Sequence, residues 1–202
     1  DDVIGKAYKL YEERLAADLG AMTELYKLGN VCAYAGRHRA QCLDAILEVA
    51  LTLAQTNKGN IQLVDKASGA LNIESHRGFS EVFLDFFKAV HSHMAATCST
   101  ALEKAQRVIV EDITESDLFR GKPSLAILLG EGVRAVQSTP LVSSAGTVLG
   151  MISTHFSEPH RPEERELRML DLLARQAADY LERMESEAKL RDSQERYRNL
   201  FD

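Results

Sequence analysis

The chain has 202 residues, of which 45% are hydrophobic, and a formal net charge of −6. This size and composition suit one globular domain with additional helices. Acidic and basic residues are interspersed, so no basic surface for nucleic acid is expected. The longest nearly apolar stretch, residues 45–54, is far shorter than the roughly 20 residues that a membrane span needs. Composition therefore argues against nucleic acid and membrane as partners.

The cysteines bear on the redox environment of the protein, and the chain ends bear on whether it is part of a longer chain. Three cysteines (Cys32, Cys42 and Cys98) without a CxxC pair argue against a disulfide framework and are typical of a reducing cytoplasm. The chain opens on Asp1 rather than on a methionine and ends within an apparent new element. We therefore expect a cytoplasmic piece of a longer protein.

The first predicted element is a long helix from Val3 to about Leu28. Its apolar residues recur at intervals of three and four, a heptad pattern with one irregular step: Ile4, Tyr8, Tyr11, Leu15, Leu19, Met22 and Tyr26. The pattern indicates a coiled coil in which Leu15 and Met22 contact a second chain. The alternative is a helix that packs on its own domain.

The middle of the chain alternates between short helices and strands. An amphipathic helix is expected near residues 41–55, followed by a hairpin of strands 59–64 and 70–74. Ser80 is a candidate N-cap for a helix with an aromatic face, formed by Phe83, Phe86 and Phe87. Thr100 and Glu103 form a candidate capping box for the next helix.

Three further strands complete the predicted sheet, at residues 108–110, 133–142 and 147–156. The last two are joined by a short turn, as are the strands of the earlier hairpin. Such turns permit only antiparallel neighbours. The expected fold class is therefore α+β.

The last predicted helix runs from Glu163 to about Asp192, with Pro162 at its start. At 1.5 Å per residue it would be roughly 45 Å long, against about 30 Å for a small domain. Its apolar residues form a strict heptad stripe. We therefore expect a parallel homodimer through the first and last helices, with an interface that includes Leu170, Ala174, Ala177, Leu181 and Met184.

Residues 60–183 resemble a GAF domain, in particular the GAF domains of bacterial multidomain sensor histidine kinases. The resemblance is carried by segments 59–63, 77–79, 98–103, 108–112, 133–141 and 151–179. It implies a central antiparallel sheet with helices on both faces and dimerisation through the terminal helices. Residues 193–201 resemble the opening of a PAS domain, which often follows in such kinases. We therefore divide the chain into a signalling helix (1–28), a GAF domain (29–184) and a linker with the start of a PAS domain (185–202).

The resemblance also implies where a ligand would bind, between the sheet and the short helices around residues 79–102. Gln137 and Thr139 share one face of their strand, and Ser153 and His155 share one face of theirs. If these faces coincide, the polar groups meet a wall of aromatic residues, as in a small-molecule site. The expected ligand-binding residues are Phe79, Phe83, Phe86, Cys98, Gln137, Thr139, Ser153 and His155. The alternative is a filled core in which the polar groups satisfy each other.

Other chemistry has weaker support in the sequence. The histidines at 91, 93, 155 and 160 have no carboxylate or thiolate beside them at ligand spacing, so no metal site is expected. GAF domains that carry a bilin attach it through a Cys followed by His, whereas Cys98 is followed by Ser99, so no bilin is expected. Cys98 is either a redox-active thiol or a small buried one. No particular cofactor is indicated.

The leading functional hypothesis is a non-catalytic sensory and dimerisation module of a signalling kinase, which responds to an unidentified small ligand and relays through coiled-coil helices. One alternative is a GAF domain that only dimerises and transmits. Another is a free methionine sulfoxide reductase, since one GAF branch uses clustered cysteines for that reaction. Cys32 and Cys42 precede the sheet, and their spacing does not place them beside Cys98.

Overall fold

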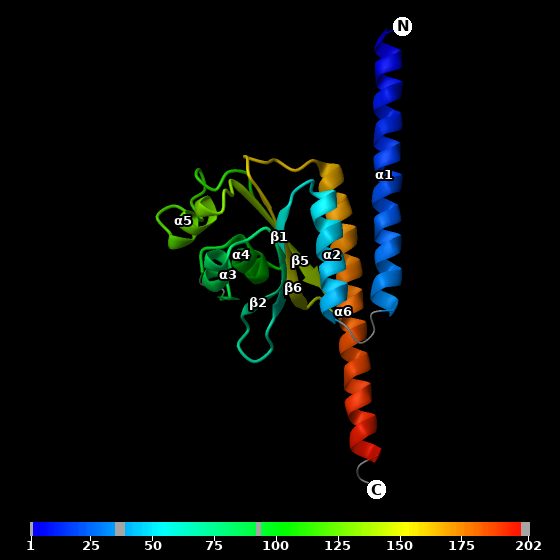
Figure 1. Cartoon of the computed structure of the whole chain (residues 1–202), viewed down its shortest axis with the longest axis vertical. Helices are drawn as coiled ribbons and strands as arrows, with labels where there is room; N and C mark the ends of the chain where they lie inside the picture. The colour runs from blue at the N-terminus through cyan, green and yellow to red at the C-terminus, as the bar shows by residue number, and fades with distance from the viewer. Residues whose placement is uncertain (1, 35–38, 92–93, 199–202) are drawn as a thin grey trace.

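The computed structural model describes residues 2–34, 39–91 and 94–198, which form six helices and six strands (Figure 1). The helices are α1 (Asp2–Tyr34), α2 (Arg39–Leu53), α3 (Glu81–Phe86), α4 (Thr97–Lys104), α5 (Pro123–Gly130) and α6 (Glu164–Arg198). The strands are β1 (Lys58–Val64), β2 (Leu71–Arg77), β3 (Ala89–Val90), β4 (Val108–Val110), β5 (Ala135–Val142) and β6 (Val148–Phe156).

The strands form one antiparallel sheet in the order β3-β2-β1-β6-β5-β4. Helices α2 and α6 pack on one face, with α1 beside them, whereas α3, α4 and α5 lie over the other face (Figure 1). This arrangement confirms the expected α+β class and the helices on both faces of the sheet. The predicted strands lie within a few residues of the observed ones.

Each face of the sheet has its own apolar core. Ile61 and Ile152 pack with residues of α2 and α6 such as Leu47. Met151, the neighbour of Ile152 in β6, instead packs with Phe83 and the other short-helix residues. Because successive strand residues point to opposite faces, the central strands are buried on both sides.

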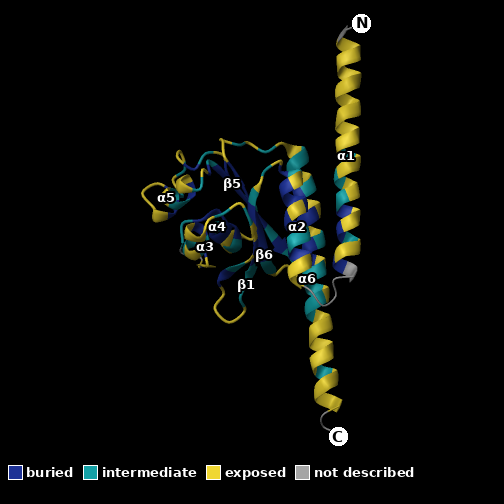
Figure 2. Ribbon diagram, in the orientation of Figure 1, coloured by how far each residue is buried: buried dark blue, intermediate teal, exposed yellow. Residues whose placement is uncertain are grey.

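Helices α1 and α6 extend beyond the domain at opposite ends (Figure 1). The N-terminal half of α1 is exposed on all sides (Figure 2), and most of its predicted stripe is uncovered: Ile4 75%, Tyr8 64%, Leu15 48% and Met22 58% exposed. The C-terminal half of α1 packs on the domain through Leu25, Leu28 and Cys32. The projection of α6 beyond the domain, predicted from its length, is confirmed.

The heptad stripe of α6 serves its own domain, contrary to expectation. Leu170, Ala174 and Ala177 are between 0% and 4% exposed in the core between α6 and the sheet. Leu181 packs half-buried at the edge of that core, and Met184 is half-buried. Their assignment to a coiled-coil seam with another chain is therefore wrong for the three buried residues. A short stripe at heptad spacing fits a flat sheet as well as a partner helix.

The expectation that the cysteines stay unpaired is also wrong. Cys32 near the end of α1 and Cys42 in α2 form a disulfide with Cα atoms 5.0 Å apart. The argument from unpaired cysteines to a reducing compartment thus loses its support. Separately, none of the helices in the described ranges combines the length and apolar character required to cross a bilayer.

Two predicted helix caps are replaced by other contacts. Helix α4 begins at Thr97, so Thr100 lies inside it and donates through Oγ1 to the Ala96 carbonyl at 3.2 Å. Ser80 precedes α3 without a capping side-chain bond. Its hydroxyl donates instead to the carboxylate of Glu131.

Candidate functional site

A cavity of about 20 Å³ lies between the sheet and the short helices. A buried space needs at least about 10–15 Å³ to hold one water molecule, so this cavity has room for water or a very small molecule. Its walls come from strands β1, β5 and β6 and from the segments around α3, α4 and α5. The lining residues are Asn60, Gln62, Phe83, Phe87, Ala96, Thr97, Cys98, Phe119, Leu128, Val136, Ser153 and His155.

The sheet side of the cavity is polar because of the strand register. Asn60 of β1 pairs with Ser153 of β6, and Ser153 pairs with Ser138 of β5. These side chains therefore share one face of the sheet. The hydroxyls of Thr97, Ser138 and Ser153 form a chain with two hydrogen bonds of 2.8 Å each. The hydroxyl groups thus satisfy one another across the sheet and α4.

Three polar atoms beside this hydroxyl chain are buried without a hydrogen bond of normal geometry within the described chain. They are Asn60 Oδ1, Gln62 Oε1 and His155 Nδ1, on side chains whose residues are 1–4% exposed. A buried polar atom left unpaired costs about 1–3 kcal/mol, and most such atoms in proteins are paired. A guest that bonds to these three atoms would therefore stabilise the fold.

Phe79 and Phe83, together called the aromatic lid here, stack beside the cavity, and Phe83 belongs to its lining. The two rings are stacked with centroids 3.8 Å apart and an interplanar angle of 6°. The imidazole of His155 meets Phe79 edge-on at 4.9 Å and Phe83 at 5.8 Å. The imidazole is thus held between the aromatic lid and the polar strands.

Lys58 and Glu131 hold the aromatic lid in place. The Lys58 ammonium donates to the backbone carbonyls of Gly78 and Glu131, both at 2.8 Å, and lies 3.7 Å from the Glu131 carboxylate. The backbone N–H of Ser80 donates to the same carboxylate at 3.3 Å. Gly78 has a φ of +80°, and a Cβ there would lie 2.8 Å from the Asn57 carbonyl, so this turn requires glycine.

His155 and Cys98, the two titratable groups among the described residues of the cavity wall, are uncharged near neutral pH. Burial, and then the positive charge of Lys58, lower the pKa of His155 to about 3, against an opposing contribution from the Ser153 backbone. Burial raises the pKa of the Cys98 thiol to about 12. The cavity therefore offers hydrogen bonds without a net charge.

The structure brings together only part of the predicted ligand site. Phe83, Cys98, Ser153 and His155 line the cavity, whereas Phe79 contacts Phe83 and His155 without belonging to the lining. Phe86 is half-buried and packs edge-on against Phe87 without lining the cavity.

Gln137 and Thr139 lie on the other face of the sheet, so their placement in the pocket is wrong. Gln137 pairs with Thr154, which alternates with Ser153 and His155 along β6. Thr139 Oγ1 accepts a 3.3 Å hydrogen bond from Arg107, whose guanidinium also bonds to α6. Gln137 and Thr139 do share one face of β5, as predicted, and Ser153 and His155 share one face of β6. This alternation within a strand does not determine how neighbouring strands are aligned, and the two pairs lie on opposite faces of the sheet.

Asn60 and Gln62 belong to the cavity and were not proposed from the sequence. The sequence contained a signal for them, because they alternate with Ile61 and precede two further apolar residues, Leu63 and Val64, in the same strand. Polar residues at every second position of a buried strand indicate a polar layer on one face.

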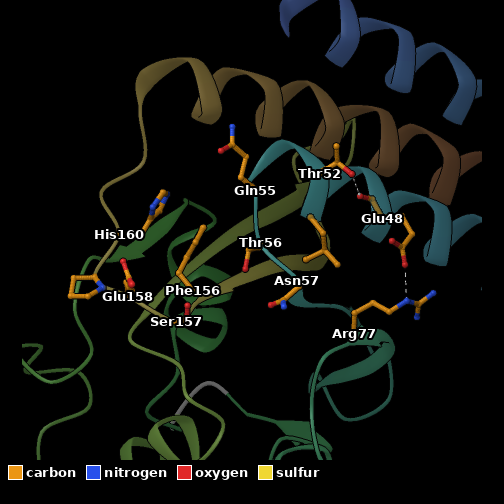
Figure 3. Close-up of a pocket in the computed structure, with 12 residues that line it drawn as sticks. Glu48, Thr52, Gln55, Thr56, Asn57, Arg77, Phe156, Ser157, Glu158 and His160 are labelled. Atoms are coloured by element: carbon orange, nitrogen blue, oxygen red, sulfur yellow. Dashed lines mark hydrogen bonds and ion pairs between the residues drawn. The ribbon is translucent and has the colours of Figure 1, made fainter.

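Two larger hollows, of about 780 Å³ each, lie at the end of α2 and are open to solvent. Figure 3 shows the first, with Arg77 and Glu48 on one side and Glu158 and His160 on the other. The Arg77 guanidinium is already paired with Glu48 at 2.6 Å. Three buried polar atoms without a partner, those of Asn60, Gln62 and His155, come together around the small cavity, so that cavity is the better candidate site.

Metal ligands are not clustered in the part of the chain that is described: no three His, Cys, Asp or Glu side chains come together there. Of the histidines considered above, His155 is buried in the cavity wall and His160 lies 3.1 Å from the Glu166 carboxylate. His93 lies outside the described residues.

Comparison with known proteins identifies the family. The GAF domain model matches residues 36–182, nearly three quarters of the chain. The chain therefore belongs to the GAF domain family. The methyl sulfide methyltransferase-associated sensor of Methanosarcina acetivorans is 30% identical over 106 residues, which make up 52% of this chain and 10% of that protein. The match thus spans about a tenth of the relative's length.

Solved structures share the fold at low sequence identity. A GAF domain of a phosphoenolpyruvate-protein phosphotransferase from Coxiella burnetii has a TM-score of 0.65 at 14% identity, covering 84% of this chain and 98% of that one. A domain of a proposed two-component sensor histidine kinase protein from Sinorhizobium meliloti gives 0.63 at 24%, covering 77% and 98%. The free methionine-R-sulfoxide reductase of Neisseria meningitidis gives 0.63 at 16%, covering 83% and 93%.

The low pKa of His155 predicts a pH dependence of stability. Its folded-state pKa of about 3 lies below the ordinary value of 6.5, so the unfolded chain takes up the proton first. The stability that the fold gains from an uncharged His155 is fully present above pH 6.5. As the pH falls towards 3, the free energy of unfolding decreases by up to about 1.4 kcal/mol per pH unit.

Urea unfolding between pH 7.5 and 4.5 measures this loss of stability. The variant His155→Gln is the control, because it keeps the pH dependence that comes from the carboxylates but lacks the imidazole. We expect the wild type to lose more stability than the variant on acidification. An imidazole that titrates near pH 6.5 in the folded protein by NMR would contradict the assignment.

Proposed function

We propose that this GAF domain is a non-catalytic sensory module of a signal-transduction protein. A small molecule in the cavity under the aromatic lid sets the packing of α2 and α6, and the projecting helices carry that state to neighbouring modules. The observation that carries the proposal is the group of three buried, unpartnered polar atoms around one small cavity.

Strands β1 and β6 supply a short route from the cavity to the helices. Asn60 and Gln62 face the cavity, whereas Ile61 between them packs on the α2 and α6 side. In β6, Ser153 faces the cavity and Ile152 faces the helices. A shift of either strand therefore moves residues of both layers, since the packed interior has little free space to absorb it.

A non-catalytic role is supported by the arrangement of the thiols. Cys32 and Cys42 are bonded to each other on the helix side of the sheet, whereas Cys98 lies on the other side. Burial raises the pKa of Cys98 to about 12, which leaves almost no thiolate at neutral pH. The likeness to a methionine sulfoxide reductase is a likeness of fold, and the clustered thiols expected of that reaction are not assembled among the described residues.

The signalling context is inferred from relatives and from the resemblance noted above. The Methanosarcina acetivorans relative is named a sensor, which favours a sensory role. A sensor histidine kinase as the parent protein, a cytoplasmic location, a PAS domain after α6 and the division at residues 28 and 184 are further parts of the proposal. Helix α6 continues to Arg198, and residues 199–202 lie outside the described chain.

Homodimerisation is proposed through α1. Its stripe from Ile4 to Tyr26 is exposed and apolar, whereas Leu25, Leu28 and Cys32 on a neighbouring face of the C-terminal half pack on the domain. An exposed apolar stripe at heptad spacing is the pattern of a coiled-coil seam. Leu170, Ala174 and Ala177 of the α6 stripe are not part of the proposed interface, because they are already buried in the core of their own domain.

The relay can be tested by filling the cavity. In Cys98→Leu the larger side chain has to enter the cavity, at a cost in stability of about 1–3 kcal/mol. We expect the amide NMR resonances of Leu173 and Ala177 in α6 to shift. Thr100→Leu, in the same helix but outside the cavity lining, is the control. Unchanged α6 resonances in Cys98→Leu, or equal changes in both variants, would refute the relay.

The dimer can be tested by placing charges on the α1 stripe. We expect sedimentation equilibrium to give a dimer for the wild type and a monomer for the double variant Leu15→Glu, Met22→Glu, because two carboxylates would be buried in the seam. Val31→Glu alters a residue that is 45% exposed and outside the stripe, and should remain dimeric. A monomeric wild type would end this part of the proposal.

A further inference from the structure

The chemistry of the cavity wall restricts the kind of molecule that fits. No Asp, Glu, Lys or Arg is among the described residues that line the cavity. The nearby ammonium, that of Lys58, is held by two carbonyls and a carboxylate at the aromatic lid. A charged guest would lose its hydration without gaining an opposite charge, which is strongly unfavourable. The wall therefore suits an uncharged guest.

The two amide groups indicate which hydrogen-bonding groups the guest carries. Gln62 Oε1 and Asn60 Oδ1 are both buried acceptors without a hydrogen-bond partner in the described chain. The two residues alternate with Ile61 and so share the cavity face of β1. The hydroxyls nearby are already joined in their own chain. The guest thus has to bring donors.

From these observations we propose that the cavity binds an uncharged molecule of very few non-hydrogen atoms that carries at least two N–H or O–H donors, such as a primary amide. The donors bond to Asn60 Oδ1 and Gln62 Oε1, and His155 Nδ1 provides a third contact. The inference rests on the proposed function, since it names the class of ligand that the sensory cavity takes.

Three planar molecules of nearly equal size test which charge the cavity accepts in a guest: formamide is neutral, formate is an anion and formamidinium is a cation. Each has three non-hydrogen atoms, for which ligand-efficiency limits allow a Kd no tighter than roughly 0.5 mM. Titration to several hundred millimolar at constant ionic strength, followed by NMR of the side-chain amides of Asn60 and Gln62, measures binding. We expect saturable shifts with formamide, and affinities at least about tenfold weaker for both ions.

Gln62 and Gln137 form a matched pair for the site. Both are 1% exposed, both have amide atoms without a hydrogen-bond partner in the described chain, and they lie on opposite faces of the sheet. Gln62→Met should weaken formamide binding at least about tenfold, whereas Gln137→Met should leave it within about twofold. If Gln62→Met does not fold, the comparison of the three probes on the wild type decides the question.

The outcomes separate the ligand class from the sensory role. Stronger cavity shifts with formate or formamidinium would overturn the neutral class and leave the proposed function standing. Equal weakening in both Met variants would overturn the assignment of Gln62. Absence of cavity shifts with all three probes would overturn the inference alone if Cys98→Leu still alters α6, and the proposed function as well if it does not.

Discussion

The central strands of this GAF domain are buried on both faces, and this constraint shapes everything around them. Polar side chains on such strands cannot reach bulk water, so each has to find a partner inside the protein. Ser138 and Ser153 do so by bonding to each other, and Ser138 also bonds to Thr97 of α4. On the same face, Asn60, Gln62 and His155 each keep an unpaired atom, and these atoms surround the small cavity that we assign as the site.

The same constraint connects the cavity to the terminal helices. The opposite faces of β1 and β6 are covered by α2 and α6, and α1 is tied to this layer by the disulfide to α2 and by the ion pair of Asp18 with Arg165 at 2.5 Å. Both projecting helices are thus anchored in one layer that lies a single sheet away from the cavity. A change in the sheet has short paths to both ends of the chain.

The fold was largely predictable because its signals are local. Turns between alternating apolar runs placed the long strands, and the run without breakers after Pro162 placed α6. The errors concern relations between elements. Gln137 was assigned to the wrong face because register between strands depends on the whole sheet. Leu170 was assigned to the interface with a partner chain, because a heptad stripe does not reveal whether a sheet or another helix packs on it. The disulfide of Cys32 with Cys42 was missed because it depends on how α1 and α2 pack together.

The central claim is that the cavity holds a polar guest, and a high-resolution crystal structure of the purified protein tests it directly. The account predicts ordered density, from water or a small uncharged molecule, within hydrogen-bonding distance of at least two of Asn60 Oδ1, Gln62 Oε1 and His155 Nδ1. A cavity closed by side-chain movement, with these three atoms bonded to protein groups instead, would contradict it.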